Sequence, residues 1–352
     1  MRELLAILLL GVLGAPPVLA RPAKDDRGAF QPHTLDAAAH FVETGKVRRG
    51  ILVYRGLLKK NPGDDRARLG LAVAVGSLWD CKEPLEILGD LRGGPLWSGV
   101  AARAQARCLA VMGDLDAARA AADDAATLDP GPGASAARAG LALRDGDRPT
   151  FEDALYALSV APGRELQVAE LQAEASVAWG TGDVDGRVAE VRRLGRGTAL
   201  EDDANSLAGL ESGRRWLDLD DPLEALASLR AVTRRHRLDP HLGAWTAEAM
   251  RRSGLLDEAL AVQGRQGIRK AKGALLDGIR ARIFVDDGRL DDAASLLAPL
   301  EASDDPEVLA SEWYLARARG DDAAMARYAA RWAGRNTSPD RTLAQLVPID
   351  AR

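Results

Sequence analysis

The sequence predicts an all-α protein, built as one extended array of repeated helix pairs. Turn residues recur about every 34 residues, and small residues recur at fixed distances from those turns. No segment shows the strict apolar-polar alternation that is typical of a strand. Each pair in such an array buries its apolar face against its neighbours, so the fold needs no single central core.

The composition agrees with a folded, soluble chain. Of 352 residues, 47% are hydrophobic and 28% charged, whereas disordered chains are poorer in apolar residues. The formal net charge of −5 argues against a nucleic-acid partner and against a basic membrane-surface protein.

The N-terminal segment reads as a targeting signal. In residues 1–20, an apolar run from Leu4 to Leu13 is about half the length that crosses a bilayer, and small residues follow at Val18 and Ala20. We therefore expect a signal peptide that is cleaved after Ala20, with an uncleaved anchor or a disordered tail as alternatives. Residues 21–31 read as a polar linker, and no later segment is apolar enough to span a membrane. The chain is thus expected to be exported, to the periplasm or outside the cell, and its Ala- and Arg-rich usage suggests a bacterium.

Residues 32–336 carry the repeat. Its unit is clearest around Gly113-Asp114, where a first helix ends at the glycine, the aspartate caps a second helix, and Pro130 stops it. Equivalent turns follow one another in steps of 32 to 38 residues, which gives nine units. The turns are Gly45-Lys46, Trp79-Asp80, Gly113-Asp114, Gly146-Asp147, Gly182-Asp183, Asp220-Asp221, Gly254-Leu255, Gly288-Arg289 and Gly320-Asp321.

Small residues follow the same period. They stand seven positions before the turn in first helices and about five after it in several second helices, where they let two helices approach closely. The first-helix positions are Ala38, Ala72, Ala106, Ala139, Ala175, Gly213, Ala247 and Ala281, and the second-helix positions are Ala118, Ala225, Ala259 and Ala293.

This pattern resembles the tetratricopeptide repeat (TPR), a 34-residue helix-turn-helix unit with small residues, glycine and a closing proline at these offsets. The chain departs from it at Trp79, which replaces a turn glycine, and at Trp313, which replaces a small residue. Pro149, just after the fourth turn, is expected to shift the following helix by a few residues. Residues 337–352 are predicted to form a short cap or a tail.

No motif for catalysis, cofactor or metal binding is present. The sequence has no phosphate-binding loop, dinucleotide fingerprint, zinc-protease motif or nucleophile elbow. His236 and His241 are separated by a helix stop, and the acidic residues between Asp218 and Glu224 lack the alternation of a calcium loop. We therefore predict no catalytic, cofactor-binding or metal-binding residue and no enzymatic activity.

Cys81 and Cys108 fall in adjacent units whose helices are neighbours in a TPR stack. In an oxidising compartment a disulfide between them is possible if their Cα atoms lie within about 7 Å. Two separately buried thiols are the alternative.

The resemblance also implies a concave groove, lined by the first helices, that binds extended peptides or helices of partner proteins. The groove positions lie about 13, 10, 6, 3 and 2 residues before each turn. Arginine predominates there, so acidic segments or a carboxylate are the expected ligands; the alternative is a solvated helix face. The candidate residues are Arg103, Arg107, Arg144, Ser176, Trp179, His241, Glu248, Arg251, Arg252, Arg282 and Arg317.

These features predict a non-enzymatic adaptor or scaffold of the bacterial envelope that binds protein partners. Two alternatives remain open. One is an accessory subunit of an envelope enzyme or secretion complex. The other is a small-molecule or glycan binder, in which Trp179 and Trp216 would be stacking platforms.

Overall fold

The computed structural model describes residues 34–348 except 44–45, 93, 95–97, 199, 236–238, 337 and 339. The predicted signal peptide and linker lie outside the described residues, as does part of the predicted tail. Across the described ranges, the chain forms helices and turns and no strand.

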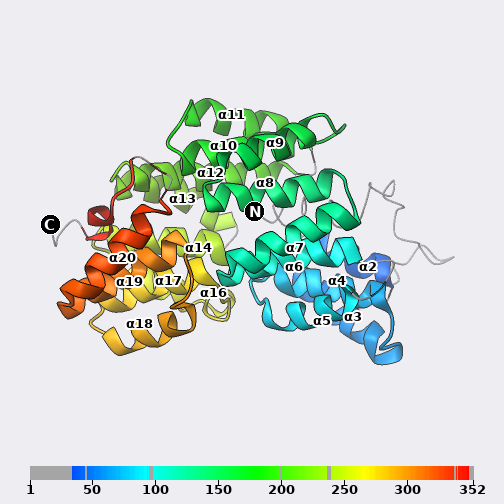
Figure 1. Cartoon of the computed structure of the whole chain (residues 1–352), viewed down its shortest axis with the longest axis horizontal. Coiled ribbons are helices and arrows are strands. Elements are labelled where there is room, and N and C mark those ends of the chain that lie inside the picture. Colours follow the sequence, from blue (N-terminus) through cyan, green and yellow to red (C-terminus); the bar gives the residue numbers. More distant parts are fainter. Residues whose placement is uncertain are drawn as a thin grey trace.

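Within residues 34–348, the described helices form nine consecutive antiparallel pairs, which confirms the predicted all-α repeat array (Figure 1). A one-turn helix, α16 (Gln266–Arg269), stands between the seventh and eighth pairs. The pairs are α2 (Leu35–Glu43) with α3 (Val47–Lys60), α4 (Asp65–Gly76) with α5 (Lys82–Arg92), α6 (Ser98–Met112) with α7 (Leu115–Leu128), α8 (Pro132–Asp145) with α9 (Arg148–Ser159), α10 (Glu165–Ala178) with α11 (Val184–Gly195), α12 (Glu201–Asp218) with α13 (Pro222–Arg235), α14 (Pro240–Arg252) with α15 (Leu256–Gln263), α17 (Ala274–Asp286) with α18 (Leu290–Leu297), and α19 (Pro306–Arg319) with α20 (Asp322–Ala333).

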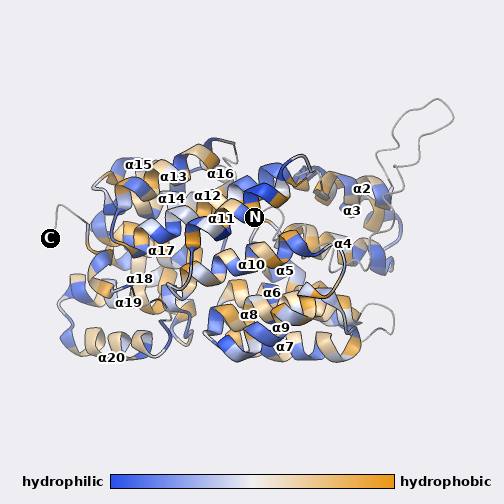
Figure 2. Cartoon of the chain, turned by 90° about the horizontal axis from the view of Figure 1, so that it is seen from above, coloured by the Kyte–Doolittle hydropathy of each residue, from blue (hydrophilic) through white to orange (hydrophobic). Residues whose placement is uncertain are grey.

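The small residues lie where helices of a pair approach each other. All the predicted alanines are buried, most of them completely. Gly213 is the strictest case, because an added Cβ would meet the Leu229 side chain at 2.5 Å. Hydrophilic and hydrophobic residues interleave along the helices in Figure 2, as expected when one stripe of each helix packs on its neighbours.

The turns follow the predicted chemistry. Asp114 accepts a hydrogen bond from Ala117 N at 3.1 Å, and Gly113 before it has a φ of +87°. Trp79 and Asp220, which replace turn glycines, are the non-glycine residues with positive φ among those described (+61° and +64°). An L-residue in this conformation is strained by about 1–2 kcal/mol, so the surrounding contacts must hold it there.

The expected shift in the fourth unit is wrong. Helix α9 begins at Arg148, directly after its cap Asp147, whose side chain accepts from Thr150 N at 3.2 Å. Helix α9 tolerates Pro149 because the backbone N–H groups of the first helical turn have no acceptor within the helix. The N–H that proline lacks therefore removes no helical hydrogen bond.

The array curls until its late units meet its early ones, so that α17 touches α6 (Figure 1). The backbone of Lys272 donates to Trp79 O at 3.0 Å, and the Trp79 ring lies 5.1 Å from that of His241. Ser303 Oγ donates to Gly113 O at 2.9 Å. These contacts join units two and three to units seven to nine and close the array into a ring.

The described part of the C-terminal segment packs back on the array. Its short helix η2 (Leu343–Leu346) contacts α19, and Leu346 and Val347 are buried in the last core cluster. Arg215 on α12 pairs with Asp340 at 2.5 Å, and Gln345 donates to the carbonyl of Asp218 at 2.9 Å. This segment therefore covers first helices from inside the curve.

Candidate functional site: a central cavity

The curled array surrounds a cavity of about 790 Å³, within the size range of small-molecule pockets. Its walls come from α3, the second helix of the first unit, and from the first helices of later units, mainly α6, α8, α10, α12 and α14. The segments around Trp79, Lys270 and Asn336 complete the lining. The groove expected from the sequence is thus an interior space in this closed ring.

One wall of the cavity is apolar and open. Ala106, Ala110 and Val111 of α6 line it beside Gly140 and Leu141 of α8. A Cβ added to Gly140 would meet nothing within 4 Å, so this position faces empty space. The small side chains leave room for a ligand and offer it a hydrophobic surface.

Three predicted groove residues line the cavity: Arg107, Arg144 and His241. Arg144 Nε bonds to the carboxylate of Asp305 at 3.0 Å, across the ring closure. Among the described residues, no ion pair neutralises Arg107, and burial lowers its pKa to about 10. Burial, followed by repulsion from Arg214, holds the pKa of His241 well below 6.5. Its Nε2 can therefore accept a hydrogen bond, which Trp245 Nε1 donates at 3.1 Å.

The next helix of the lining, α10, contacts α8 and is acidic on the side that lines the cavity. Gln167, Glu170 and Glu174 are spaced three and four residues apart, which places them on one side of the helix, and all three line the cavity. One oxygen of each side chain is buried and has no hydrogen-bond partner in the described part of the chain. Burial raises the pKa of Glu170 to about 7, and burial together with the charge of Glu211 raises that of Glu174 to about 8.

Four other predicted groove residues form a buried ion network. Glu248 accepts two hydrogen bonds from Arg251, at 2.9 and 3.0 Å, and lies 3.4 Å from Arg282. Arg282 also bonds to Glu307 at 3.0 Å. Arg252 bonds to Asp220 at 2.9 Å. These guanidinium groups face carboxylates of the chain itself, and Arg251 also donates to the Leu346 carbonyl of the C-terminal segment at 2.5 Å.

The remaining predicted residues lie outside the cavity lining. Arg103 is buried and pairs with Asp129, and Ser176 donates to the carbonyl of Gln172 at 2.7 Å. Trp179 is buried in the core and packs edge-on against Phe151. Arg317 is exposed beside Trp313. Trp216, the second candidate stacking platform, is 38% exposed and is also absent from the cavity wall.

Sequence reasoning missed the α10 wall because it counted back from the wrong glycine. Gly180 and Gly182 both have positive φ, and α10 already ends at Ala178. Counting 13, 10, 6 and 2 residues back from Gly180 gives Gln167, Glu170, Glu174 and Ala178, which all line the cavity. An error of two residues turns the expected face by about 200°. The regular step of 34 residues from Gly146 to Gly180 was the available signal.

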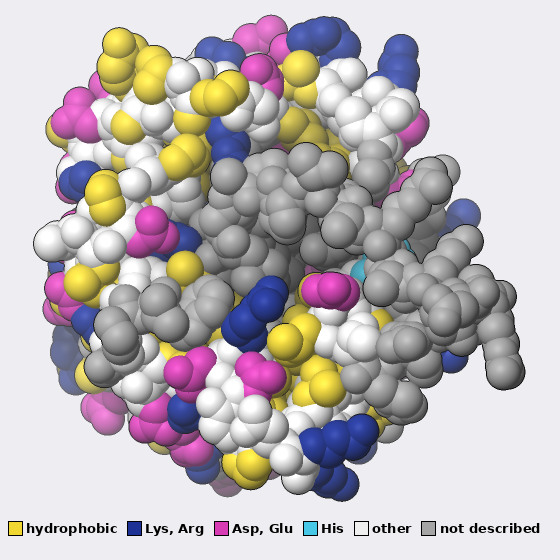
Figure 3. All heavy atoms as spheres, turned by 90° about the vertical axis from the view of Figure 1, so that its right-hand side faces the viewer, with side chains coloured by type: hydrophobic (Ala, Val, Ile, Leu, Met, Phe, Trp, Pro, Cys, Tyr) yellow, Lys and Arg dark blue, Asp and Glu magenta, His cyan; other side chains and the backbone are white. Residues whose placement is uncertain are grey.

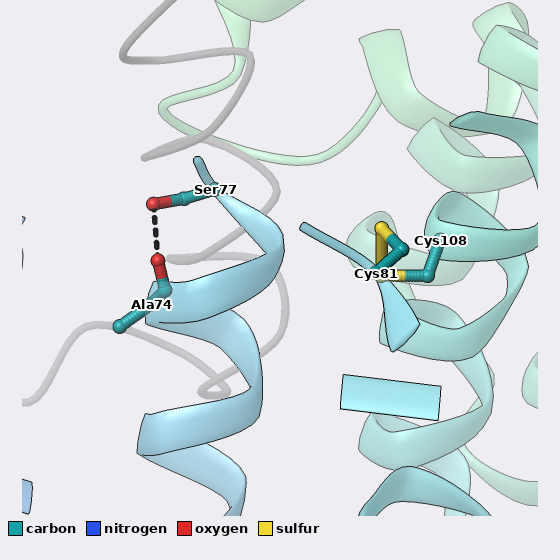
Figure 4. The surroundings of a disulfide bond; sticks show 4 residues. All are labelled: Ala74, Ser77, Cys81 and Cys108. Carbon is teal, nitrogen blue, oxygen red and sulfur yellow. Dashed lines mark hydrogen bonds between the residues drawn. A yellow bond between two sulfur atoms is a disulfide. The ribbon is translucent and has the colours of Figure 1, made fainter. Parts of the chain in front are cut away.

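Cys81 and Cys108 are joined by a disulfide, with their Cα atoms 5.3 Å apart (Figure 4). Both are buried, and the bridge ties the start of the second unit's second helix to α6. Nearby, Ser77 Oγ donates to Ala74 O at 2.7 Å and closes the end of α4. The bridge thus holds the turn that contains Trp79.

Within the described ranges, no group of three or more His, Cys, Asp or Glu side chains is arranged to hold a metal ion. The same part of the chain contains no helix with the length and hydrophobicity needed to cross a membrane. On the face shown in Figure 3, acidic and basic side chains are interspersed among the coloured atoms.

No protein-family model matches the chain, and no curated protein matches it. The chain is similar to solved structures at low sequence identity. One is the crystal structure of the APC/C hetero-tetramer Cut9-Hcn1, with 13% identity, a TM-score of 0.36, and coverage of 85% of this chain and 72% of that one. Another is the TPR domain of P58(IPK), with 12% identity, a TM-score of 0.26, and coverage of 86% and 92%. The TPR-like fold assignment rests on the helix pairs of this chain itself.

Proposed function

We propose that this protein is a non-enzymatic adaptor that holds a segment of a partner protein in its central cavity. The observation that carries the proposal is the cavity itself: about 790 Å³, lined by the first helices of successive units. The cavity combines an apolar wall on α6 and α8 with charged and polar groups, and three side chains of α10 in it each have an oxygen without a hydrogen-bond partner among the described residues. A ligand with both apolar and polar groups, such as a peptide, matches this lining.

We further propose that the protein acts outside the cytoplasm, in a bacterial envelope. The disulfide supports this location, because such bridges persist in oxidising compartments and are rare in the cytosol. The apolar run from Leu4 to Leu13 supports export as well. If this is right, Edman sequencing of the mature protein will begin at Arg21, and a mature chain that retains residues 1–20 contradicts cleavage.

Two glycines offer a matched test of binding in the cavity. Gly140 lines the cavity, and Gly89 lies exposed on α5 outside it; an added Cβ meets nothing within 4 Å at either position. A photo-cross-linking amino acid placed at each position, in cells that make the protein, reports what touches each surface. We expect a protein adduct from position 140 and none of the same mass from position 89.

The tryptophan variants at these positions complete the test. Gly140→Trp is expected to fill the cavity and abolish co-purification of the cross-linked partner, whereas Gly89→Trp retains it. Both variants should keep the helical circular dichroism of the wild type. A partner that is captured equally from both positions, or no adduct from position 140, refutes binding in the cavity.

A further inference from the structure

We propose that the α10 wall, formed by Gln167, Glu170 and Glu174, is a recognition site for a cationic group, namely a lysine or arginine side chain of the partner segment. This inference rests on the proposed function and specifies the chemistry of the segment. The groove predicted from the sequence was basic, and counting from Gly182 passed over these residues.

The first support is the set of unsatisfied acceptors. Glu170 is 2% exposed and Gln167 is 7% exposed, yet Glu170 Oε2 and Gln167 Oε1 make no hydrogen bond with the residues that the structure describes. Glu174 Oε1 is likewise buried without a partner. A buried acceptor without a donor costs about 1–3 kcal/mol, and more when it is charged, so a ligand that brings N–H donors would recover this energy.

The second support is charge. The nearby carboxylate Glu211 is already matched, because Arg214 on α12 donates to both of its oxygens at 3.0 and 3.1 Å. Glu170 and Glu174 have no such ion pair in the part of the chain that the structure describes. An added cation would satisfy both carboxylates.

The third support is shape. Acceptors at positions 167, 170 and 174 follow one line along the helix, so they can accept hydrogen bonds from an ammonium or a guanidinium that lies along that side of α10. The apolar wall of α6 and α8 lines the same cavity and can take the aliphatic stem of a lysine or arginine or its apolar neighbours.

Two peptides test the proposal by fluorescence anisotropy. Both are twelve residues long, acetylated and amidated, with alternating Leu and Ala and with every third residue either Lys or Glu. We expect the lysine peptide to bind the wild-type protein at least about 10-fold more tightly than the glutamate peptide, as for a charge-assisted hydrogen bond. Equal affinities, or a preference for the glutamate peptide, overturn the proposal and favour an acidic partner segment.

The variants Glu170→Gln and Glu174→Gln should each weaken the lysine peptide, and the double variant should weaken it about 10-fold or more. Glu152→Gln, an exposed position on α9, serves as the control and should bind like the wild type. The cavity variants should fold, because glutamine has the shape of the protonated acid; their melting temperatures check this. Unchanged affinity in the folded double variant overturns the proposal.

These outcomes separate the two proposals. If position 140 cross-links a partner but the α10 variants retain binding, only the cation site fails. If position 140 yields no adduct, the adaptor function fails whatever the peptides do.

Discussion

Replacing Glu248 by glutamine tests whether the buried ion network holds the C-terminal half of the ring. Glu248 is 1% exposed and is shared by Arg251 and Arg282, which are themselves buried. The variant keeps the shape of the side chain but leaves the two guanidinium groups with less negative charge. Arg251 retains Asp286 at 2.7 Å, and Arg282 retains Glu307.

Two estimates of the stability that Glu248→Gln would lose agree with each other. Burial alone would raise the pKa of Glu248, but the charges of Arg251 and Arg282 outweigh burial and hold that pKa at about 2, against the usual 4.5. Since a tenfold change in proton affinity is worth about 1.4 kcal/mol, this corresponds to about 3 kcal/mol. Removing one partner of a buried ion pair typically costs about 3–5 kcal/mol. We therefore expect Glu248→Gln to lose about 3–5 kcal/mol at pH 7.

Urea unfolding followed by circular dichroism measures this loss, with the exposed variant Glu152→Gln as the control at less than about 0.5 kcal/mol. The sign of the pH dependence adds a second check. Because the folded pKa is depressed, the stabilisation by Glu248 is complete above about pH 4.5 and disappears as the pH falls towards 2. The gap between wild type and variant should therefore close at low pH. A loss below about 1 kcal/mol, or a gap independent of pH, refutes the reasoning.

Three further predictions concern the ring closure. Reducing the Cys81–Cys108 bridge should cost about 3–4 kcal/mol, because it spans 27 residues; unfolding with and without reductant measures this, and a Cys81→Ala/Cys108→Ala variant should not respond to reductant. Trp79→Gly restores the usual turn residue and relieves about 1–2 kcal/mol of strain, yet we expect a net loss of stability in urea because the contact with His241 disappears; a variant more stable than the wild type contradicts this role. The pKa of His241 is lowered in the folded chain. Below about pH 6.5, the His241 imidazole therefore binds a proton in the unfolded chain but stays neutral in the folded chain. Wild-type stability should thus fall more steeply than that of His241→Gln between pH 6.5 and 5, and parallel curves would contradict the buried, neutral imidazole.

The fold was predictable because it is encoded locally. The spacing of turn residues and small residues repeats along the chain, and each pair needs only its neighbours, so short-range patterns define the nine units. Trp79, which the sequence identified as a substitute for a turn glycine, adopts the positive φ of that glycine, whereas the shift expected from Pro149 does not occur.

The candidate site was less predictable because it depends on helix phase. In the unit with a longer turn, counting from Gly182 instead of Gly180 selected Ser176 and Trp179 and passed over Glu170 and Glu174. A repeat period locates a helix to within a few residues, whereas the face that it presents changes by about 100° with each residue.

The sequence by itself determined the order and number of the helix pairs and the turns between their helices, because these follow from neighbouring residues along the chain. Only the tertiary structure decided that the array closes on itself, through contacts such as that between Arg144 and Asp305, which lie 161 residues apart. It also decided which charges are matched: most of the arginines expected in the groove meet carboxylates of the same chain, while Glu170 and Glu174 have no ion pair with any other described residue. Two charged side chains pair only when they lie close together in space. Their distance is set by the curvature of the array, which accumulates over many helix pairs.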